Sequence, residues 1–258
     1  RFPLMGWRGV LMGITLLIIW RFYLNPHAEK EWSSLYTWQG LIVIFAFSIN
    51  SIAFTLGIQE TSVMVVLTAV ATMPIFAAIL SSFMLREAQG WVSWLTIIFA
   101  MIGVVIVVSD GNNAIGQPEG STVLGAIYGA ITAFGLALVF TMARKYPNLG
   151  VVPAAAIGAL FSGIIGFALS AEGSVFNAPI WTVFTMGVVI LPVSFTCLSL
   201  APRYTTSATV SLVMLLEMVI GPFWVWFVIG EKPSIIMIIG ACLVIVVIAF
   251  HIIRTQFY

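Results

Sequence analysis

The feature that most constrains this chain is a series of long apolar segments joined by short connectors. A helix needs about 20 apolar residues to cross the hydrocarbon core of a bilayer, and nine such segments occur within the 258 residues. Hydrophobic residues make up 61% of the chain and charged residues only 7%, whereas soluble domains carry about 25% charged residues. The chain is therefore predicted to be an all-α polytopic membrane protein. The predicted spans are Met5–Leu24, Thr37–Gly57, Ser62–Leu85, Trp91–Ser109, Val123–Ala143, Val151–Ser170, Ile180–Leu200, Ser207–Ile229 and Ser234–Ile253.

The second constraint is an internal repeat with a constant offset of 144 residues. Thr61–Gln89 and Thr205–Pro233 align without a gap. Each starts with threonine, continues through a mostly apolar stretch long enough to span a membrane, and reaches a glutamate, Glu87 or Glu231, before the next apolar segment. If each unit holds five helices, an odd number, the two units must enter the membrane in opposite directions. Inverted repeats of this kind are common in secondary transporters, whose substrate site lies near the bilayer midplane between the repeats.

The distribution of basic residues predicts the orientation of the chain. With alternating spans, seven basic residues fall on one side and three, among them Arg8, on the other. The positive-inside rule then places the larger set and the C-terminus in the cytoplasm, in a multi-pass protein of the inner or plasma membrane. The repeat partner of Val123–Ala143 would precede Arg1, so we expect a ten-helix parent that has lost its first helix here. The predicted repeats are residues 1–115 and 116–258.

Three stretches of this repeat resemble a known family. They are the segment that runs from Thr61 through Pro74 to Glu87, its recurrence as LLEMVIGPFWVWFVIGE, and the following IIGACLVIVVI. Together they resemble the EamA-type carriers of the drug/metabolite transporter superfamily, over nearly the whole chain. The resemblance implies export of amino acids or related metabolites. Within that group, the YddG-like aromatic amino-acid exporters are similar in length and layout.

Glu217 is the candidate for chemistry inside the membrane. It lies eleven residues into the predicted span Ser207–Ile229, where burying a carboxylate costs a few kcal/mol. We therefore expect it to face a wet cavity, and to bind a substrate amine or exchange a proton. The alternative is a protonated glutamate that hydrogen-bonds a neighbouring helix.

Small polar side chains predict the rest of a cavity. Ser48, Ser51 and Thr55 recur at helical spacing, with Asn50 beside them. The amide of Asn50 is assigned to the cavity, because an amide facing lipid would be poorly satisfied. The hydroxyls suit a cavity and helix packing equally well. The predicted substrate-binding or cavity residues are Asn50, Ser51, Thr68, Thr72, Tyr128, Met214 and Glu217.

Two further groups of residues are interpreted as structural. Proline inside a span breaks or bends the helix, so Pro74, Pro192 and Pro222 are predicted hinges. Glu87 and Glu231 each stand just before a following span, where the positive end of that helix favours a carboxylate. We interpret both glutamates as residues that cap the following helix and fix where it begins, rather than as substrate ligands.

The prediction is a carrier that moves a small organic solute by alternating access, with the solute and the lipid bilayer as its partners and a monomer expected. No enzymatic activity, cofactor or metal site is predicted, since His27 and His251 lack ligand partners at a useful spacing. Ten Lys and Arg residues are too few for nucleic-acid binding as the main function.

Two rival functions stay open at this point. A membrane assembly or scaffold protein would not need inverted repeats around a polar midplane. A lipid-modifying membrane enzyme would need acids or histidines clustered at one membrane face, whereas the nine acidic residues here are scattered along the chain.

Overall fold

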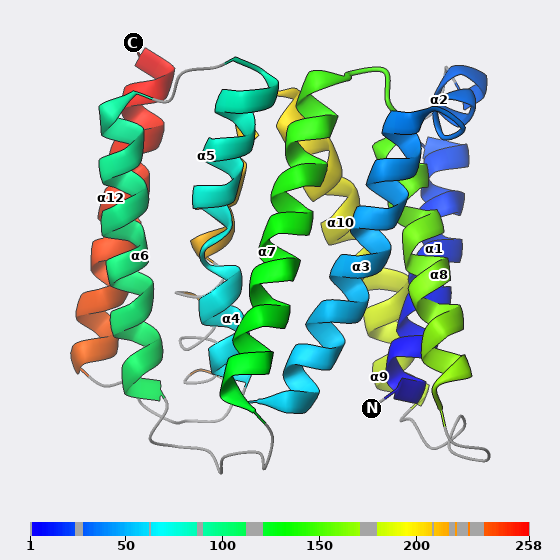
Figure 1. The fold of residues 1–258 in the computed structure, drawn as a ribbon, viewed down its shortest axis with the longest axis horizontal. Coiled ribbons are helices and arrows are strands. Elements are labelled where there is room, and N and C mark those ends of the chain that lie inside the picture. Colours follow the sequence, from blue (N-terminus) through cyan, green and yellow to red (C-terminus); the bar gives the residue numbers. More distant parts are fainter. Residues whose placement is uncertain are drawn as a thin grey trace. The chain divides into compact units, whose positions relative to one another are not determined.

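The computed structural model describes residues 2–23, 28–61, 63–86, 90–111, 121–170, 180–207, 209–216, 220, 227 and 235–257. All regular elements in these ranges are helices, which confirms the predicted all-α fold (Figure 1). Five of the helices are long and apolar enough to cross a membrane. The elements are α1 (Phe2–Tyr23), α2 (Ala28–Ser34), α3 (Trp38–Glu60), α4 (Val63–Val70), α5 (Met73–Met84), α6 (Trp91–Gly111), α7 (Thr122–Lys145), α8 (Val151–Ala168), α9 (Ile180–Phe184), the π-helical η1 (Thr185–Ile190), α10 (Leu191–Leu200), the 3₁₀ turn η2 (Ala201–Arg203) and α12 (Ile235–Phe257).

The helices form two compact units, and neither unit follows the order of the chain. Unit 1 holds residues 1–55 and 138–205, and unit 2 holds residues 56–137 and 206–258. Each unit thus combines helices from the first and the second half of the sequence. The proposed sequence repeats at 1–115 and 116–258 are a different division, which stays a prediction.

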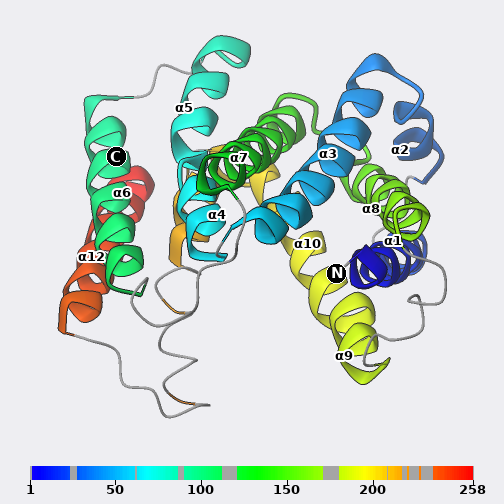
Figure 2. The same cartoon turned by 60° about the horizontal axis from the view of Figure 1, so that its bottom comes forward.

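Unit 1 is built around the contact between α1 and α8, which lie side by side in Figures 1 and 2. A Cβ added at Gly6 would lie 2.5 Å from the Phe167 ring, and one at Gly9 would lie 2.7 Å from the Cα of Gly163. Further along α1, Gly13 meets Leu160. Residue numbers rise along α1 while they fall along α8, so the two helices are antiparallel. Glycine permits this close approach of the two backbones.

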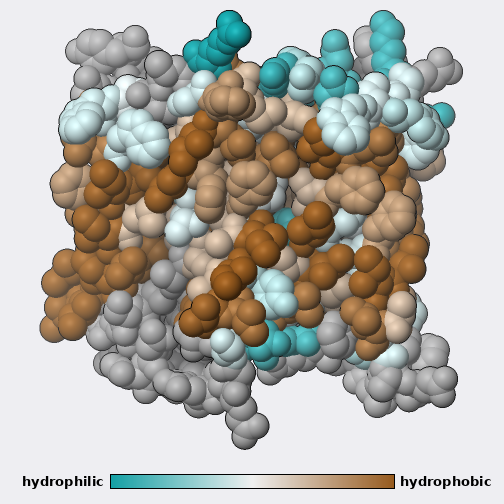
Figure 3. All heavy atoms as spheres, viewed as in Figure 1, coloured by the Kyte–Doolittle hydropathy of each residue, from teal (hydrophilic) through white to brown (hydrophobic). Residues whose placement is uncertain are grey.

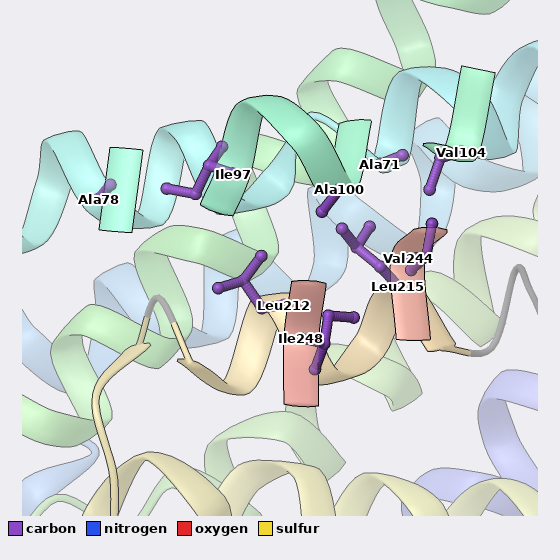
Figure 4. Close-up of a cluster of buried hydrophobic side chains, with 9 residues drawn as sticks. All are labelled: Ala71, Ala78, Ile97, Ala100, Val104, Leu212, Leu215, Val244 and Ile248. Atoms are coloured by element: carbon purple, nitrogen blue, oxygen red, sulfur yellow. The ribbon is translucent and has the colours of Figure 1, made fainter. Parts of the chain in front are cut away.

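Unit 2 contains a similar antiparallel pair, α6 and α12 (Figure 1). Here a Cβ at Gly103 would lie 3.0 Å from the carbonyl oxygen of Gly240. A cluster of nine buried hydrophobic residues joins this pair to α5, to Ala71 just after α4, and to residues 209–216 (Figure 4). Three pairs of cluster members stand at the 144-residue offset of the sequence repeat: Ala71 with Leu215, Ala100 with Val244, and Val104 with Ile248.

The long helices present apolar side chains outward, as lipid-facing helices do. Figure 3 shows hydrophobic side chains along the helices and hydrophilic ones gathered near helix ends. Phe45 in α3, Phe161 in α8 and Val246 in α12 are each more than half exposed, at 63%, 53% and 65%. With no water to satisfy backbone groups in the hydrocarbon core, helices are the form that such segments can take.

Two predicted spans are interrupted where they contain proline. The segment Ser62–Leu85 is two helices, because α4 ends at Val70 and α5 begins at Met73 with Pro74 in its first turn. The hydroxyl of Thr72 donates to the carbonyl oxygen of Ala69 at 2.7 Å and so satisfies a backbone acceptor at the break. The segment Ile180–Leu200 passes through the π-helical turn η1 before α10, which carries Pro192 in its first turn. Proline has no backbone N–H to donate within a helix, and a π-helical turn is wider than an α-helical one. Both commonly disrupt a regular helix.

A polar network closes one end of unit 1. The indole Nε1 of Trp20 donates to Oε2 of Glu31 at 2.7 Å, and Nη2 of Arg203 lies 3.4 Å from Oε1 of the same carboxylate. Arg203 Nη2 also donates to the carbonyl oxygen of Leu149 at 2.8 Å. This Glu31 network ties together α1, α2, η2 and the turn between α7 and α8.

The contact between α1 and α8 predicts that Gly163 tolerates no side chain. A Cβ there would lie 2.7 Å from the backbone nitrogen of Val10 and 3.0 Å from the Gly6 oxygen, so Gly163→Ala should destabilise unit 1 by about 1–3 kcal/mol and lower the melting temperature in detergent. Gly90→Ala is the matched control, because a Cβ at Gly90 would have no neighbour within 4 Å. Equal melting temperatures for the two variants would contradict the close packing.

The Glu31 network predicts a smaller loss for Glu31→Gln. The amide oxygen can still accept from Trp20, but the attraction between the carboxylate and Arg203 disappears. With side chains 21% and 23% exposed, the expected loss is about 1 kcal/mol, measured as a lower melting temperature. Glu60→Gln, the same change at the end of α3, should leave the melting temperature unchanged. A loss in that control as large as in Glu31→Gln would rule out a specific role for the network.

Candidate functional site

The predicted cavity residues are distributed over both compact units. Asn50 and Ser51 lie on α3 in unit 1, whereas Thr72, Tyr128 and Met214 belong to unit 2. The side chain of Thr68 in α4 and the residues Glu217, Pro222, Glu87 and Glu231 lie outside the described residues. Their predicted roles stay predictions.

In unit 2, the hydroxyls of Thr72, Thr96 and Thr132 each bond a carbonyl oxygen three or four residues earlier in the chain. The hydroxyl of Thr72 bonds the carbonyl oxygen of Ala69 at the α4–α5 break. Tyr128 is half-buried in α7, and its Cβ would be 3.3 Å from a Cβ added at Gly57, so this part of α7 packs tightly on the end of α3. Met214 is half-buried in the helical residues 209–216.

In unit 1, α3 carries two kinds of polar residue. Ser48 is buried, and its hydroxyl lies 2.9 Å from the carbonyl oxygen of Ile44 and 3.3 Å from that of Gly158 in α8. It therefore contributes to the contact between α3 and α8. Asn50 is only 7% exposed, although an amide carries two donor hydrogens and an acceptor oxygen. A buried amide on a membrane helix needs polar surroundings, which is consistent with its predicted place in a cavity.

Arg8 is a candidate site residue that is not among the cavity residues predicted from the sequence. Because Arg8 lies near the start of α1, the positive-inside count treated it as a residue at the end of a span. The structure places it five residues inside the candidate span Pro3–Phe22. Its Nη2 donates to Oγ1 of Thr55 in α3 at 3.4 Å. The signal available in the sequence was an arginine followed by the mostly apolar residues Gly9 to Trp20, with Arg21 at the far end of the helix as its other charge.

The site around Arg8 is bordered by the irregular helix that precedes α10. A Cβ at Gly187 in η1 would lie 2.9 Å from Cβ of Leu11, one turn along α1 from Arg8. Segments of π-helix occur frequently at functional sites. Pro192 is buried in the first turn of α10, which directly follows η1. In unit 1, Arg8 and the hydroxyl of Thr55 therefore lie one turn of α1 from the contact with this irregular helix.

This arrangement can recognise a polar solute but offers little for catalysis. A guanidinium has five N–H donors and stays charged at any physiological pH, so it binds anions and does not act as a general base. The described group that contacts it is the hydroxyl of Thr55, which itself donates to the carbonyl oxygen of Ser51. Hydrogen-bond donors and acceptors of this kind set the orientation of a bound ligand.

The comparisons with known proteins agree with a helical membrane fold. The EamA-like transporter family matches residues 1–109 and again residues 123–253. YdfC, an uncharacterized transporter of Bacillus subtilis strain 168, is 25% identical over 213 residues, a match that covers 78% of this chain and 66% of that protein. One protein of known crystal structure superposes with a TM-score of 0.75 at 13% identity, covering 96% of this chain and 86% of the other. This likeness shows a shared fold. Because the family match extends over most of the sequence in two segments, the chain is a member of the EamA-like transporter family.

Proposed function

We propose that this membrane transporter is a secondary carrier that exports small organic metabolites, above all amino acids, by alternating access. The coarser part of this statement, a transporter of small molecules, comes with family membership. The amino-acid substrate, the outward direction and the alternating mechanism are the proposal. We also propose that the protein resides in the inner or plasma membrane with its C-terminus in the cytoplasm.

One observation supports alternating access most strongly. In each compact unit, a helix of the first half packs antiparallel against a helix of the second half, α1 with α8 and α6 with α12. Pairs of residues at the repeat offset, such as Ala100 and Val244, share one buried cluster. In secondary transporters, inverted repeats give two related conformations that open the same site to opposite sides.

The rival functions are less well supported. A scaffold role does not account for membership in a transporter family or for a cation inside a candidate span. A lipid-modifying enzyme would need acids or histidines gathered at one membrane face, whereas the described carboxylate network contains Glu31 paired with Arg203, a structural arrangement.

The flux of labelled amino acids tests the proposed function. The protein is reconstituted into liposomes, and uptake of a radiolabelled amino-acid panel is followed with and without an imposed pH gradient. We expect saturable uptake that unlabelled substrate competes away, and none in protein-free liposomes. Stimulation by the gradient indicates proton coupling, while an unchanged rate indicates facilitated diffusion. Absence of uptake across the panel would contradict an amino-acid substrate.

A second prediction concerns Glu217 as the coupling group. If this carboxylate exchanges a proton during transport, Glu217→Gln should keep substrate uptake but abolish its response to the pH gradient, because an amide does not ionise. Glu60→Gln is the matched control and should keep the response. Uptake by Glu217→Gln that still follows the pH gradient would assign coupling to another group.

A further inference from the structure

Arg8 is a cation within a membrane-spanning helix, and such a residue needs a partner. It lies five residues inside the candidate span Pro3–Phe22, roughly 7 Å from its start at 1.5 Å per residue. A charged side chain at this depth is costly, and such residues usually face a water-filled cavity or pair with an opposite charge.

The hydrogen bonds around Arg8 show how little of its guanidinium is used. Thr55 Oγ1 donates its own hydrogen to the carbonyl oxygen of Ser51 at 2.9 Å, so it presents a lone pair to Arg8, whose Nη2 donates at 3.4 Å. Within the described ranges, no carboxylate pairs with Arg8. The ion pair described in these ranges joins Arg203 and Glu31. One of five N–H donors is thus engaged by a described residue, through a long hydrogen bond.

The face of α1 that carries Arg8 turns away from α8. The contacts with α8 are made by Gly6, Gly9 and Gly13. Leu11 shares the face of Arg8, since residues three apart are neighbours on a helix, and Leu11 contacts Gly187 of η1. Arg8 therefore points toward α3 and lies one turn from the contact with η1, on the protein side of α1.

We propose that Arg8 is the anion-binding group of the transport site and that the transported solutes carry a carboxylate. Thr55 is its positioning residue, because the hydroxyl, fixed by Ser51, orients the guanidinium. The planar fork of an arginine matches the two oxygens of a carboxylate and binds them with parallel, charge-assisted hydrogen bonds. This inference rests on the proposed function and narrows its substrate class to carboxylate-bearing solutes.

Ligand binding to the purified full chain in detergent tests the assignment. The probes are a panel of amino acids, the C-terminal amide of each, and inorganic phosphate, with binding measured as ligand-dependent increase of the melting temperature. At least one amino acid should stabilise the protein, with its amide and phosphate about tenfold weaker or worse. Arg8→Gln should weaken binding of that amino acid by about tenfold or more and leave the affinity for its amide unchanged.

Further variants separate recognition from folding. Arg8→Lys keeps the charge without the fork and should retain part of the affinity, while Thr55→Val should weaken binding by a few fold with a near-normal melting temperature in the absence of ligand. Arg21→Gln is the control, because Arg21 is an exposed residue at the other end of the same helix. Its ligand affinity should equal that of the unchanged protein.

Several results would overturn the assignment. The assignment is wrong if amino acids and their amides stabilise the protein equally, or if phosphate stabilises it as much as amino acids or more. It is also wrong if Arg8→Gln leaves the affinity unchanged, or if no amino acid stabilises the protein. An arginine that only reaches toward the membrane surface gives equal stabilisation by amino acids and their amides, or an unchanged affinity in Arg8→Gln. Liposome flux separates this inference from the proposed function. If Arg8→Gln does not change the flux, the carrier function stands and the anion-binding role of Arg8 is wrong. If binding depends on Arg8 but no flux occurs, the anion-binding role stands and the carrier function is wrong.

Discussion

The structure depends on the close antiparallel packing of helices that occupy equivalent places in the two halves of the sequence. Helix association in a bilayer lacks the hydrophobic driving force found in water and relies on van der Waals contact between closely approaching backbones. Gly9 and Gly163 provide that approach in unit 1, and Gly103 beside Gly240 provides it in unit 2. The repeat of five helices that we propose from the sequence gives this antiparallel direction in both pairs, because an odd number of helices reverses the second unit.

These pairings also explain why a site can form away from the contact surfaces. The glycine face of α1 is occupied by α8, which leaves the face with Arg8 and Leu11 toward α3 and η1. There the regular helix is interrupted by a π-helical turn just before Pro192, and irregular backbone needs polar partners inside a membrane. A cation with several N–H donors that no described residue engages, one turn of α1 from an irregular helix, is suited to a polar solute. In unit 1, therefore, packing against α8 and the proposed recognition by Arg8 use different faces of α1.

Much of the fold could be predicted from the sequence, and less of the site. The apolar segments predicted helices because hydrocarbon excludes other backbone forms, and the prolines predicted irregularity near residues 74 and 192. The interleaved compact units could not be predicted, because a pattern along the chain does not say which helices meet. Arg8 was overlooked because a charge near the end of an apolar segment resembles an interfacial residue. The pairing of Glu31 with Arg203 joins residues 172 positions apart, beyond any local signal.

Side-specific labelling tests the inverted repeat most directly. Glu60 ends α3, and Tyr204, which is 85% exposed, follows η2 at the 144-residue offset. Single cysteines are placed at these two positions after Cys197 and Cys242 are replaced by serine, and a membrane-impermeant maleimide is applied to sealed vesicles of known orientation. The account predicts that Glu60→Cys and Tyr204→Cys are labelled from opposite sides of the membrane. Labelling of both from the same side would contradict the inverted repeat and the mechanism derived from it.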